Sequence, residues 1–371
     1  MILIHTEPCD LHAIAVACML QDRGHTVGRL IGMAFPEHES ISFRTAQEEV
    51  PSLRLTEGET TLEADKVEAV WYRRPRSIRL PAQVHESDQE YAYNECTELY
   101  RGFVFAPADA FWINPIESQN LSNNKVLQLR AAQNIGFRVP DTLISNVPAE
   151  VREFVGAGQR VIYKPLRGAS WLVNGEVHGT YTTPVTTADL PSDGLLRACP
   201  GIYQALVRKS YEVRAQFFGN TCMAAKIDSN QMEYGEYDWR RHQTTSDPNS
   251  EPVALPENIE SLCLQMMREL RIVSGAFDLI VDESGEWVFL EVNPVGQFAF
   301  LERWCPDLPV MAAFCDFIES RDPEFKFAGR GHHASLADIM ASDTFRAMMV
   351  DDMDRYEKRD IGRRSVVESN A

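Results

Sequence analysis

The chain has 371 residues, and 36 lysines and arginines face 54 aspartates and glutamates, which leaves a formal net charge of −18. This length suggests two or three domains with a sizeable core. An acidic surface repels phosphate backbones and anionic lipids, which argues against a nucleic-acid-binding or membrane-binding protein. A hydrophobic content of 44% and a charged content of 24% are typical of globular proteins and argue against disorder.

The sequence shows no pattern typical of a membrane span, a signal peptide or a cysteine-based metal site. The longest apolar run, Ala13 to Leu20, is much shorter than the ~20 residues of a membrane span, and no basic stretch precedes it as in a signal peptide. The eight cysteines are scattered, with no CxxC pair and no zinc-ligand spacing. We therefore expect a cytoplasmic protein with free thiols that contacts neither nucleic acid nor membrane.

Residues 1–113 have the pattern of a small α/β domain. Ile2 to Ile4 predicts a short strand, Asp10 a helix cap, and Leu11 to Leu20 the helix that follows. Val67 to Tyr72 predicts a later strand. Strands alternating with helices indicate an α/β layer arrangement.

A basic run follows the later strand and departs from the acidic balance of the chain. It contains four arginines in seven residues: Arg73, Arg74, Arg76 and Arg79. They fit a binding site for an acidic peptide or a carboxylate near a domain junction. They fit equally well a solvated edge with internal ion pairs, so both interpretations stay open.

Residues 114–210 predict a helix followed by a β-rich subdomain. The helix should run from Glu117 through Asn134, carry Lys125, and end at Gly136. Two adjacent stripes on it are Val126, Leu129, Gln133 and Leu127, Arg130, Asn134. Three short β runs surround a Thr/Pro-rich loop and suggest a mobile lid: Val161 to Lys164, Val177 to Tyr181 and Ile202 to Val207.

Lys164 ends a β run and precedes a short loop that contains Gly168 and Ser170. Such a loop can wrap phosphates with backbone N–H groups and a hydroxyl. Together with Lys125, Lys164 would supply the local positive charge that an acidic protein needs to hold a nucleotide. Taken alone, each lysine also fits an ordinary solvated side chain.

Residues 211–320 are predicted to form the core of a second unit. Two β runs, Glu212 to Phe218 and Met223 to Asp228, are joined by Gly219-Asn220, a hairpin signal. A helical face with spacings of three and four covers 259–270. Beyond residue 321 the chain turns polar, and the amphipathic stretch Leu336 to Met349 predicts a docked helix followed by a frayed tail.

The most informative stretch is Phe277 to Pro294, in which two β runs flank Ser284-Gly285. With the turn centred between these two residues, Asp278 lies directly across from Glu291, and Asn293 is one step further on the same face. The opposite face would be apolar and would meet the core with Phe277, Leu279, Val281, Val288, Leu290 and Val292.

Like charges placed directly opposite each other destabilise a sheet, so a cation between the two carboxylates would explain the pair. Two carboxylates and an amide suit Mg²⁺ or Mn²⁺, which complete their coordination with water and nucleotide phosphate. The alternative is an ordinary hairpin whose polar face meets water.

The order of these features resembles the ATP-grasp superfamily. The motifs that carry the resemblance are Asn114-Pro115 before Lys125, then Lys164, Gln204 to Val207, Glu212-Val213-Arg214, Phe277-Asp278 and Glu291 to Pro294. A narrower set resembles the microviridin-type peptide ligases, or graspetide synthetases: Val70 to Pro75, Tyr211 to Arg214, Asp238 to Arg240 and Asn293 to Gln297.

The resemblance implies an α/β (α+β) ATP-grasp fold and a role for each matching position. The domains would be a pre-ATP-grasp domain (1–113), a helix plus lid (114–210), a metal and ATP core (211–320) and a C-terminal helical extension (321–371). Contacts to ATP would come from Lys125, Lys164, Gln204, Ala205, Leu206, Val207 and Glu212, and contacts to Mg²⁺ from Asp278, Glu291 and Asn293. Arg214 and Arg240 would face the phosphoryl-transfer centre, and Arg73, Arg74 and Asp238 the substrate.

The implied activity is the activation of Asp or Glu side chains of a ribosomal precursor peptide as acyl phosphates. Ser/Thr hydroxyls or Lys amines then displace phosphate and close macrolactone or macrolactam rings. The partner would be that peptide, with a leader bound near Met223 to Arg241 and an acidic core, and the enzyme would be a homodimer. Two alternatives stay open: a ligase that adds a free amino acid to a carboxylate, as the ribosomal-protein glutamate ligases do, and an ATP-binding protein whose catalysis has lapsed.

Overall fold

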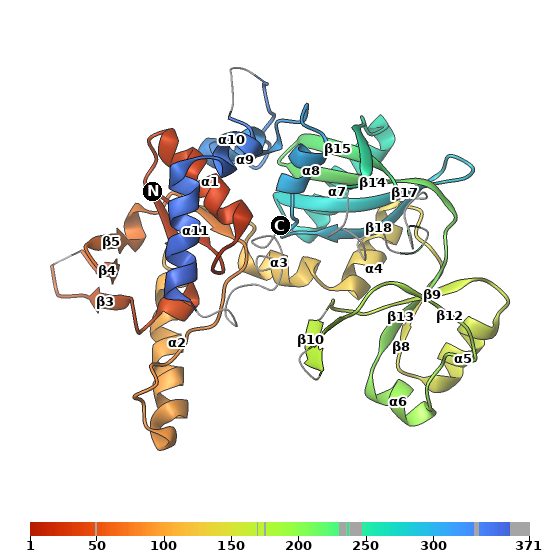
Figure 1. Cartoon of the computed structure of the whole chain (residues 1–371), viewed down its shortest axis with the longest axis horizontal. Coiled ribbons are helices and arrows are strands. Elements are labelled where there is room, and N and C mark those ends of the chain that lie inside the picture. The colour runs from red at the N-terminus through yellow and green to blue at the C-terminus, as the bar shows by residue number, and fades with distance from the viewer. Residues whose placement is uncertain are drawn as a thin grey trace.

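Figure 1 presents the computed structural model of the chain, which describes residues 1–48, 50–168, 170–173, 176–229, 235, 237, 247–329 and 334–356. The first unit is a parallel four-stranded sheet in the order β2 (Val27–Leu30), β1 (Ile2–His5), β6 (Ala69–Tyr72) and β7 (Phe111–Ile113). Ile2 and Ile4 face one hydrophobic cluster and Leu3 faces another. Both faces of the sheet are therefore covered, as parallel sheets require.

Helix α1 (Leu11–Asp22) covers one face of this sheet. Its predicted cap is confirmed, because an Asp10 carboxylate oxygen accepts hydrogen bonds from the backbone N–H groups of His12 and Ala13. The other face is covered by α2 (Gln89–Phe105) and an antiparallel sheet of β3 (Ser40–Arg44), β4 (Ser52–Glu57) and β5 (Thr60–Glu63). Short 3₁₀ turns occupy Gly32–Ala34, Ala64–Lys66 and Glu86–Asp88.

The single helix predicted from Glu117 through Asn134 is wrong, because the structure has two helices, α3 (Ile116–Ser122) and α4 (Lys125–Ile135). The Asn124 side chain caps α4 by accepting the N–H groups of Val126 and Leu127, which starts a new helix at Lys125. The predicted stripes are also wrong. The residues that α4 buries are Gln128, Ala131 and Ala132.

The β-rich subdomain is built on an antiparallel sheet in the order β12 (Thr183–Val185), β9 (Val161–Lys164), β13 (Gly201–Ala205) and β8 (Thr142–Ser145). A separate hairpin joins β10 (Ser170–Val173) to β11 (Glu176–Gly179). Helices α5 (Pro148–Gly156) and α6 (Asp193–Ala198) pack on the sheet through a small apolar cluster. The three β runs predicted here are strands β9, β11 and β13.

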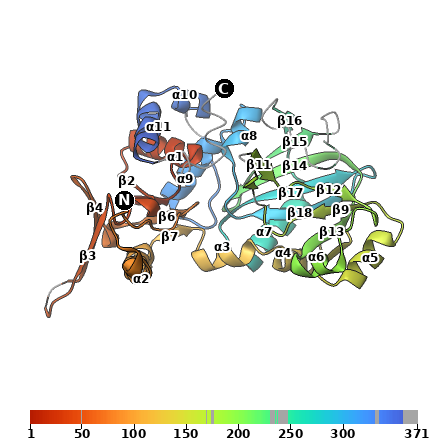
Figure 2. The ribbon, with the colours of Figure 1, turned by 60° about the horizontal axis from the view of Figure 1, so that its bottom comes forward.

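The largest sheet is antiparallel, in the order β16 (Asn249–Pro252), β15 (Thr221–Asp228), β14 (Lys209–Phe218), β17 (Ser274–Asp282) and β18 (Trp287–Asn293). The predicted hairpin between β14 and β15 is confirmed, with Gly219 in the left-handed region at φ +56°. Helices α4 and α7 (Glu257–Leu270) cover one face of this sheet. The other face is turned partly toward the β-rich subdomain (Figure 2).

The predicted register of the β17–β18 hairpin is partly wrong. Asp278 pairs with Glu291 as expected, but Val281 pairs with Trp287 instead of Val288. The register shifts by one residue at a β-bulge between Asp278 and Leu279. Gly285, at φ +86°, and the bond from Asp282 N to Glu286 O form the turn. The bulge moves Leu290 off the predicted core face.

The last elements return to the first unit. Helices α8 (Ala299–Trp304), α9 (Val310–Ser320), α10 (Leu336–Met340) and α11 (Asp343–Arg355) share a hydrophobic cluster with α1. The predicted docked helix is thus a pair of helices, α10 and α11, and α11 lies beside α1 in both views (Figures 1 and 2). In the described part of the chain, no helix is long and apolar enough to cross a membrane.

Candidate nucleotide and metal site

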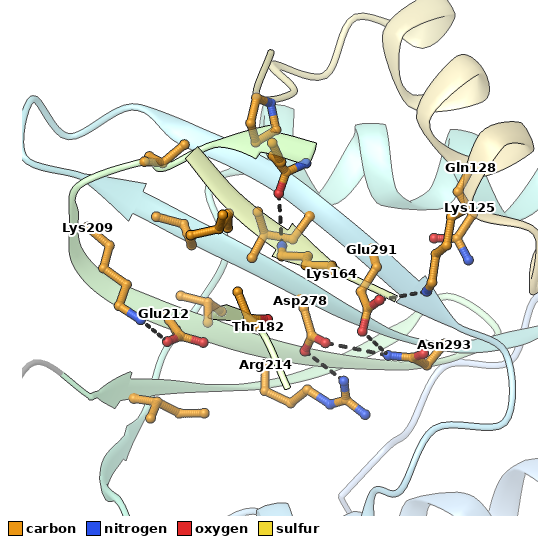
Figure 3. A pocket seen from close by; sticks show the side chains of 18 of the residues that line it. Lys125, Gln128, Lys164, Thr182, Lys209, Glu212, Arg214, Asp278, Glu291 and Asn293 are labelled. Atoms are coloured by element: carbon orange, nitrogen blue, oxygen red, sulfur yellow. Dashed lines mark hydrogen bonds and ion pairs between the residues drawn. The ribbon is translucent and has the colours of Figure 1, made fainter. Parts of the chain in front are cut away.

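A cavity of about 360 Å³ lies between the β-rich subdomain and the large sheet (Figure 3). Most of the predicted site residues line it, from six different elements and two loops. These are Arg74, Lys125, Lys164, Gln204, Ala205, Leu206, Val207, Glu212, Arg214, Asp278, Glu291 and Asn293. Arg73 is buried nearby, whereas Asp238 and Arg240 lie outside the described residues.

The carboxylates of Asp278 and Glu291 face each other across β17 and β18, and Asn293 joins them (Figure 3). The Asn293 amide nitrogen lies 3.1 Å from Glu291 Oε1 and 3.4 Å from Asp278 Oδ2. Each carboxylate also has a cation at 2.6 Å, Lys125 Nζ on Glu291 and Arg214 Nη1 on Asp278. These cations offset the repulsion of two like charges that the strands place side by side.

The donor atoms at this point fit a divalent ion. Two carboxylates offer oxygen ligands, and a flip of the Asn293 amide would turn its Oδ1 toward the same point. In the described part of the chain, no group of three or more His, Cys, Asp or Glu side chains could hold a metal. An ion here would therefore complete its shell with water and ligand oxygens, as Mg²⁺ does at nucleotide sites.

The segment Gln204 to Val207 lines the cavity together with several apolar side chains. These include Ile162, Ile202, Ile280 and Leu290. Lys164 Nζ donates to Gln204 Oε1 at 2.8 Å, and Gln204 Nε2 donates to Thr142 Oγ1 at 2.8 Å, so these two polar chains are fixed. Apolar side chains beside a backbone segment suit a purine base.

Hydrogen bonds already made by the backbone of Gln204 to Val207 limit which of its N–H groups could bind the edge of adenine. The N–H of Ala205 already donates to Asp141 O at 2.8 Å, and the N–H of Leu206 to Arg160 O at 2.9 Å. A ring nitrogen of a base must therefore meet a donor further along, and Val207 is the next residue that lines the cavity.

Sequence reasoning missed several polar residues in the cavity: Gln128, Thr182 and Lys209. Lys209 is 8% exposed and contacts Glu212, whose Oε1 also accepts from Ser229 Oγ at 2.9 Å. The spacing of three residues between Lys209 and Glu212 is the sequence feature that could have indicated this pair. The same spacing occurs at many surface ion pairs, so it does not single out a site.

Three side chains from distant parts of the chain hold the end of β18, which carries Asn293, and the segment that follows it. Gln128 bonds both backbone groups of Val292, and Asn114 Nδ2 donates to Pro294 O at 2.8 Å. His12 Nε2 accepts from the N–H groups of Phe298 and Ala299, each at 3.1 Å. Burial, to which Arg73 adds, lowers the pKa of His12 well below its ordinary value, so the ring stays neutral and can accept.

The arginine run forms internal ion pairs and also reaches the cavity. Arg73 Nε lies 2.6 Å from Asp10 Oδ2, and its guanidinium sits 5.1 Å from the centre of the Trp71 ring. Arg74 Nη1 lies 2.8 Å from Glu7 Oε1 while Arg74 lines the cavity. The alternative of a solvated edge with internal ion pairs is wrong about solvation at Arg73, which is 2% exposed, and right about its internal ion pair.

Residues 1–120 match the family model of the MvdD pre-ATP grasp domain. The chain is similar to macrocyclase MdnC from Microcystis aeruginosa MRC, solved with precursor peptide MdnA, at 30% identity and a TM-score of 0.75, over 87% of this chain and 100% of that one. It is also similar to a Chryseobacterium gregarium RiPP-associated ATP-grasp ligase, solved with ADP, a leader and a core peptide, at 26% identity and a TM-score of 0.79, over 87% and 97%. The chain is also similar to macrocyclase MdnB from the same Microcystis strain, at 27% identity and a TM-score of 0.69, over 85% of this chain and 98% of that one. Among curated proteins, none matches the chain.

The fold and the cavity define an ATP-grasp ligase, with a pre-ATP-grasp domain ahead of two sheets that enclose the site. Within that class the chain belongs to the family of ATP-grasp peptide macrocyclases, the graspetide synthetases. The resemblance and the fold expected from the sequence are thereby confirmed.

Proposed function

We propose that the chain uses ATP to activate Asp or Glu side chains of a ribosomal precursor peptide and joins them to Ser/Thr hydroxyls or Lys amines of the same peptide. The observation that carries the proposal is the convergence of Asp278, Glu291 and Asn293 with Lys125 and Arg214 in one cavity. The relatives MdnC and the Chryseobacterium ligase, solved with peptides, support a peptide as the partner.

ATP would lie with its base against Val207 and the apolar walls, and with its phosphates between Lys125 and Lys164. Both lysines line the cavity, where they supply positive charge in an otherwise acidic chain. Glu212 lines the same cavity and would accept a hydrogen bond from a ribose hydroxyl. ADP in the Chryseobacterium relative supports a nucleotide here.

Asp278, Glu291 and Asn293 would hold Mg²⁺, and Mn²⁺ suits the same oxygen donors. When bound, the ion neutralises charge on the phosphate oxygens. Lys125 and Arg214 would then be released from the carboxylates that they pair with in this structure, and would turn toward phosphate.

The reaction would run in two balanced steps. A peptide carboxylate attacks the γ-phosphate, the bond to the β-phosphate oxygen breaks, and an acyl phosphate and ADP result. A hydroxyl or amine then attacks the acyl carbon, loses its proton, and expels phosphate. Arg214, and Arg240 outside the described residues, would stabilise the transferring oxygens, while Arg74 and Arg73 would orient the carboxylate. The β-rich subdomain would exclude water from the acyl phosphate.

The finer features remain proposals of the same kind. We expect domain limits near residues 113, 210 and 320, a homodimer in solution, and action in the cytoplasm. All eight cysteines are free, which fits a reducing compartment. Size-exclusion chromatography with light scattering tests the dimer, and a monomer mass at micromolar concentration would contradict it.

The experiment that tests the function is incubation with ATP, Mg²⁺ and a candidate precursor peptide, followed by mass spectrometry. The proposal predicts the loss of one water for each bond formed, with matching release of ADP and phosphate. A gain of one amino-acid residue would instead support the ligase that adds a free amino acid. ATP binding without any turnover would support the lapsed enzyme.

A further inference from the structure

We propose that helix α11 of the C-terminal extension is a positioning element for the peptide side of the reaction. It acts through Asp352, which holds the loop of residues 6–10, and this loop pairs with Arg74, which lines the cavity. The proposal rests on the proposed function, because it assumes that the peptide carboxylates bind near Arg74.

The first step is the contact between α11 and the loop. Asp352 is 1% exposed, and its Oδ2 accepts the backbone N–H of Cys9 at 2.7 Å. The same carboxylate makes a two-pronged pair with Arg29, at 2.7 and 2.8 Å. Cys9 has φ +54°, a left-handed conformation that a residue with a side chain rarely adopts, so the loop needs such external support.

The second step leads from the loop to the arginines. Glu7 accepts from Arg74 at 2.8 Å and also pairs with Arg76, while Asp10 pairs with Arg73 at 2.6 Å. Thr6 Oγ1 donates to Asp10 Oδ2 at 3.1 Å, which fixes the carboxylate. Burial alone would raise the pKa of Asp10, but the facing Arg73 holds it below its ordinary value, so the carboxylate stays charged.

The third step leads from the arginines to the peptide. Three guanidinium groups share two carboxylates, so the cluster keeps a local surplus of one positive charge beside the cavity. The Nη1 and Nη2 atoms of Arg73 are buried and have no acceptor among the described residues. The surplus charge suits an added carboxylate at Arg74, the member of the cluster that lines the cavity, and its position depends on where the loop of residues 6–10 holds Arg74.

The contact between α11 and the loop of residues 6–10 does not involve the residues proposed to bind the nucleotide. The residues proposed to contact the nucleotide are Lys125 of α4, Lys164 of β9, and the segment Gln204 to Val207 at the end of β13 and just beyond it. None of the contacts in the steps above involves them. Loss of the Asp352 contact should therefore weaken peptide binding while ATP binding is kept.

The test compares Asp352→Asn with Asp351→Asn, a matched change one residue earlier on α11, where the carboxylate is exposed and pairs with Arg355. A second control, Met348→Ala, loosens the packing of α11 on α1 without touching Cys9. The dissociation constant is measured for a fluorescein-labelled peptide rich in Asp, Glu, Ser and Thr by anisotropy. The dissociation constant for ATP with Mg²⁺ is measured by calorimetry.

We expect Asp352→Asn to weaken binding of the labelled peptide about tenfold, with ATP binding within about twofold of the parent. Both controls should bind the peptide within about twofold of the parent. The proposal is overturned if Asp352→Asn and Asp351→Asn bind the peptide alike, if Met348→Ala weakens it as much, or if the parent does not bind the peptide. A parent that binds the peptide but forms no rings contradicts the proposed function alone.

Discussion

The site depends on a few charged side chains whose positions follow from the two-residue period of a strand. Asp278 and Glu291 come from neighbouring strands, and Asn293 is two residues beyond Glu291, on the same face. In this structure Lys125 and Arg214 complete the balance of charge. Any change that removes one carboxylate leaves a cation with a weaker partner and removes an oxygen ligand.

Asp278→Asn or Glu291→Gln should therefore lower ATP turnover by at least about 100-fold, because each would remove a charged ligand of the proposed metal ion. Both variants should keep the fold, since they preserve side-chain shape and relieve the repulsion between the two carboxylates. Steady-state ADP release and far-UV circular dichroism are the measurements. Glu283→Gln, at an exposed position of the same hairpin, is the control, and full turnover in either site variant would refute the metal assignment.

Glu39 lies outside the site and is 5% exposed. Burial, with the charge of Glu57 adding to it and that of Arg355 opposing it, raises the pKa of Glu39 to about 8. The hydroxyls of Tyr100 and Tyr356 belong to the same surroundings, since Glu39 contributes to the raised pKa of each.

The folded protein thus binds a proton on Glu39 that the unfolded chain loses near pH 4.5. The stabilisation that this bound proton gives the folded state is fully present below pH 4.5, and it is lost as the pH rises to about 8. Glu39→Gln should remove this loss and raise the free energy of unfolding at pH 8 by about 1–3 kcal/mol. Urea unfolding at pH 5 and pH 8 measures it. Equal effects at both pH values, or the same gain in the exposed control Glu37→Gln, would contradict the prediction.

At this scale the sequence predicted the pairing of Asp278 with Glu291, and the structure places this pair and both lysines in one cavity, while their roles stay predictions. Strand period and motif order are local properties, so one sequence can reveal them. Lys209, Gln128 and His12 were not predicted. Each acts through a partner far away in the chain or through an ordinary charge spacing, and neither leaves a distinct pattern in one sequence.

At the scale of elements, the break between α3 and α4 decides where Lys125 lies. A continuous helix would carry this lysine in its middle, whereas the Asn124 cap puts it in the first turn of α4, with its Nζ 2.6 Å from Glu291. The first turn of a helix is also the end that favours anions, so a phosphate would gain from both the lysine side chain and the helix dipole.

Asn124→Ala should destabilise the protein by about 1 kcal/mol, since it removes the acceptor of two backbone N–H groups. It should also raise the KM for ATP several-fold, because the start of α4 frays and Lys125 loses its position. Thermal unfolding and initial-rate kinetics measure the two effects. Asn123→Ala is the matched control, and an unchanged KM in Asn124→Ala would show that the cap does not position the lysine.

The hairpin of β17 and β18 shows how a prediction can succeed for an incomplete reason. The turn centre was predicted half a residue late, which shifts the pairs beside the turn by one residue. The bulge adds one residue back before Asp278 meets Glu291, so the two offsets cancel at the site. Hydrophobic alternation could not reveal the bulge, because Val288, Phe289 and Leu290 are all apolar.

At the scale of the whole molecule, the first and last elements share one hydrophobic cluster. Helix α1 packs with α9, α10 and α11, and Phe218 of the large sheet joins them. The pre-ATP-grasp domain is therefore fixed against the site, which explains how His12 and Arg74 reach it from the first 80 residues. The sequence predicted a docked C-terminal helix from its apolar spacing. The sequence could not predict where this helix docks, since its Asp352 pairs with Arg29, which lies 323 positions earlier.

The central claim is that a peptide carboxylate becomes an acyl phosphate in this cavity. The most direct measurement uses a precursor peptide whose Asp and Glu carboxylates carry ¹⁸O, incubated with ATP and Mg²⁺. The phosphate released is then analysed by mass spectrometry. The account predicts one ¹⁸O atom in the phosphate for each ring closed, because the carboxylate oxygen that attacks the γ-phosphate leaves with it. Phosphate without ¹⁸O, with rings formed, would contradict the account.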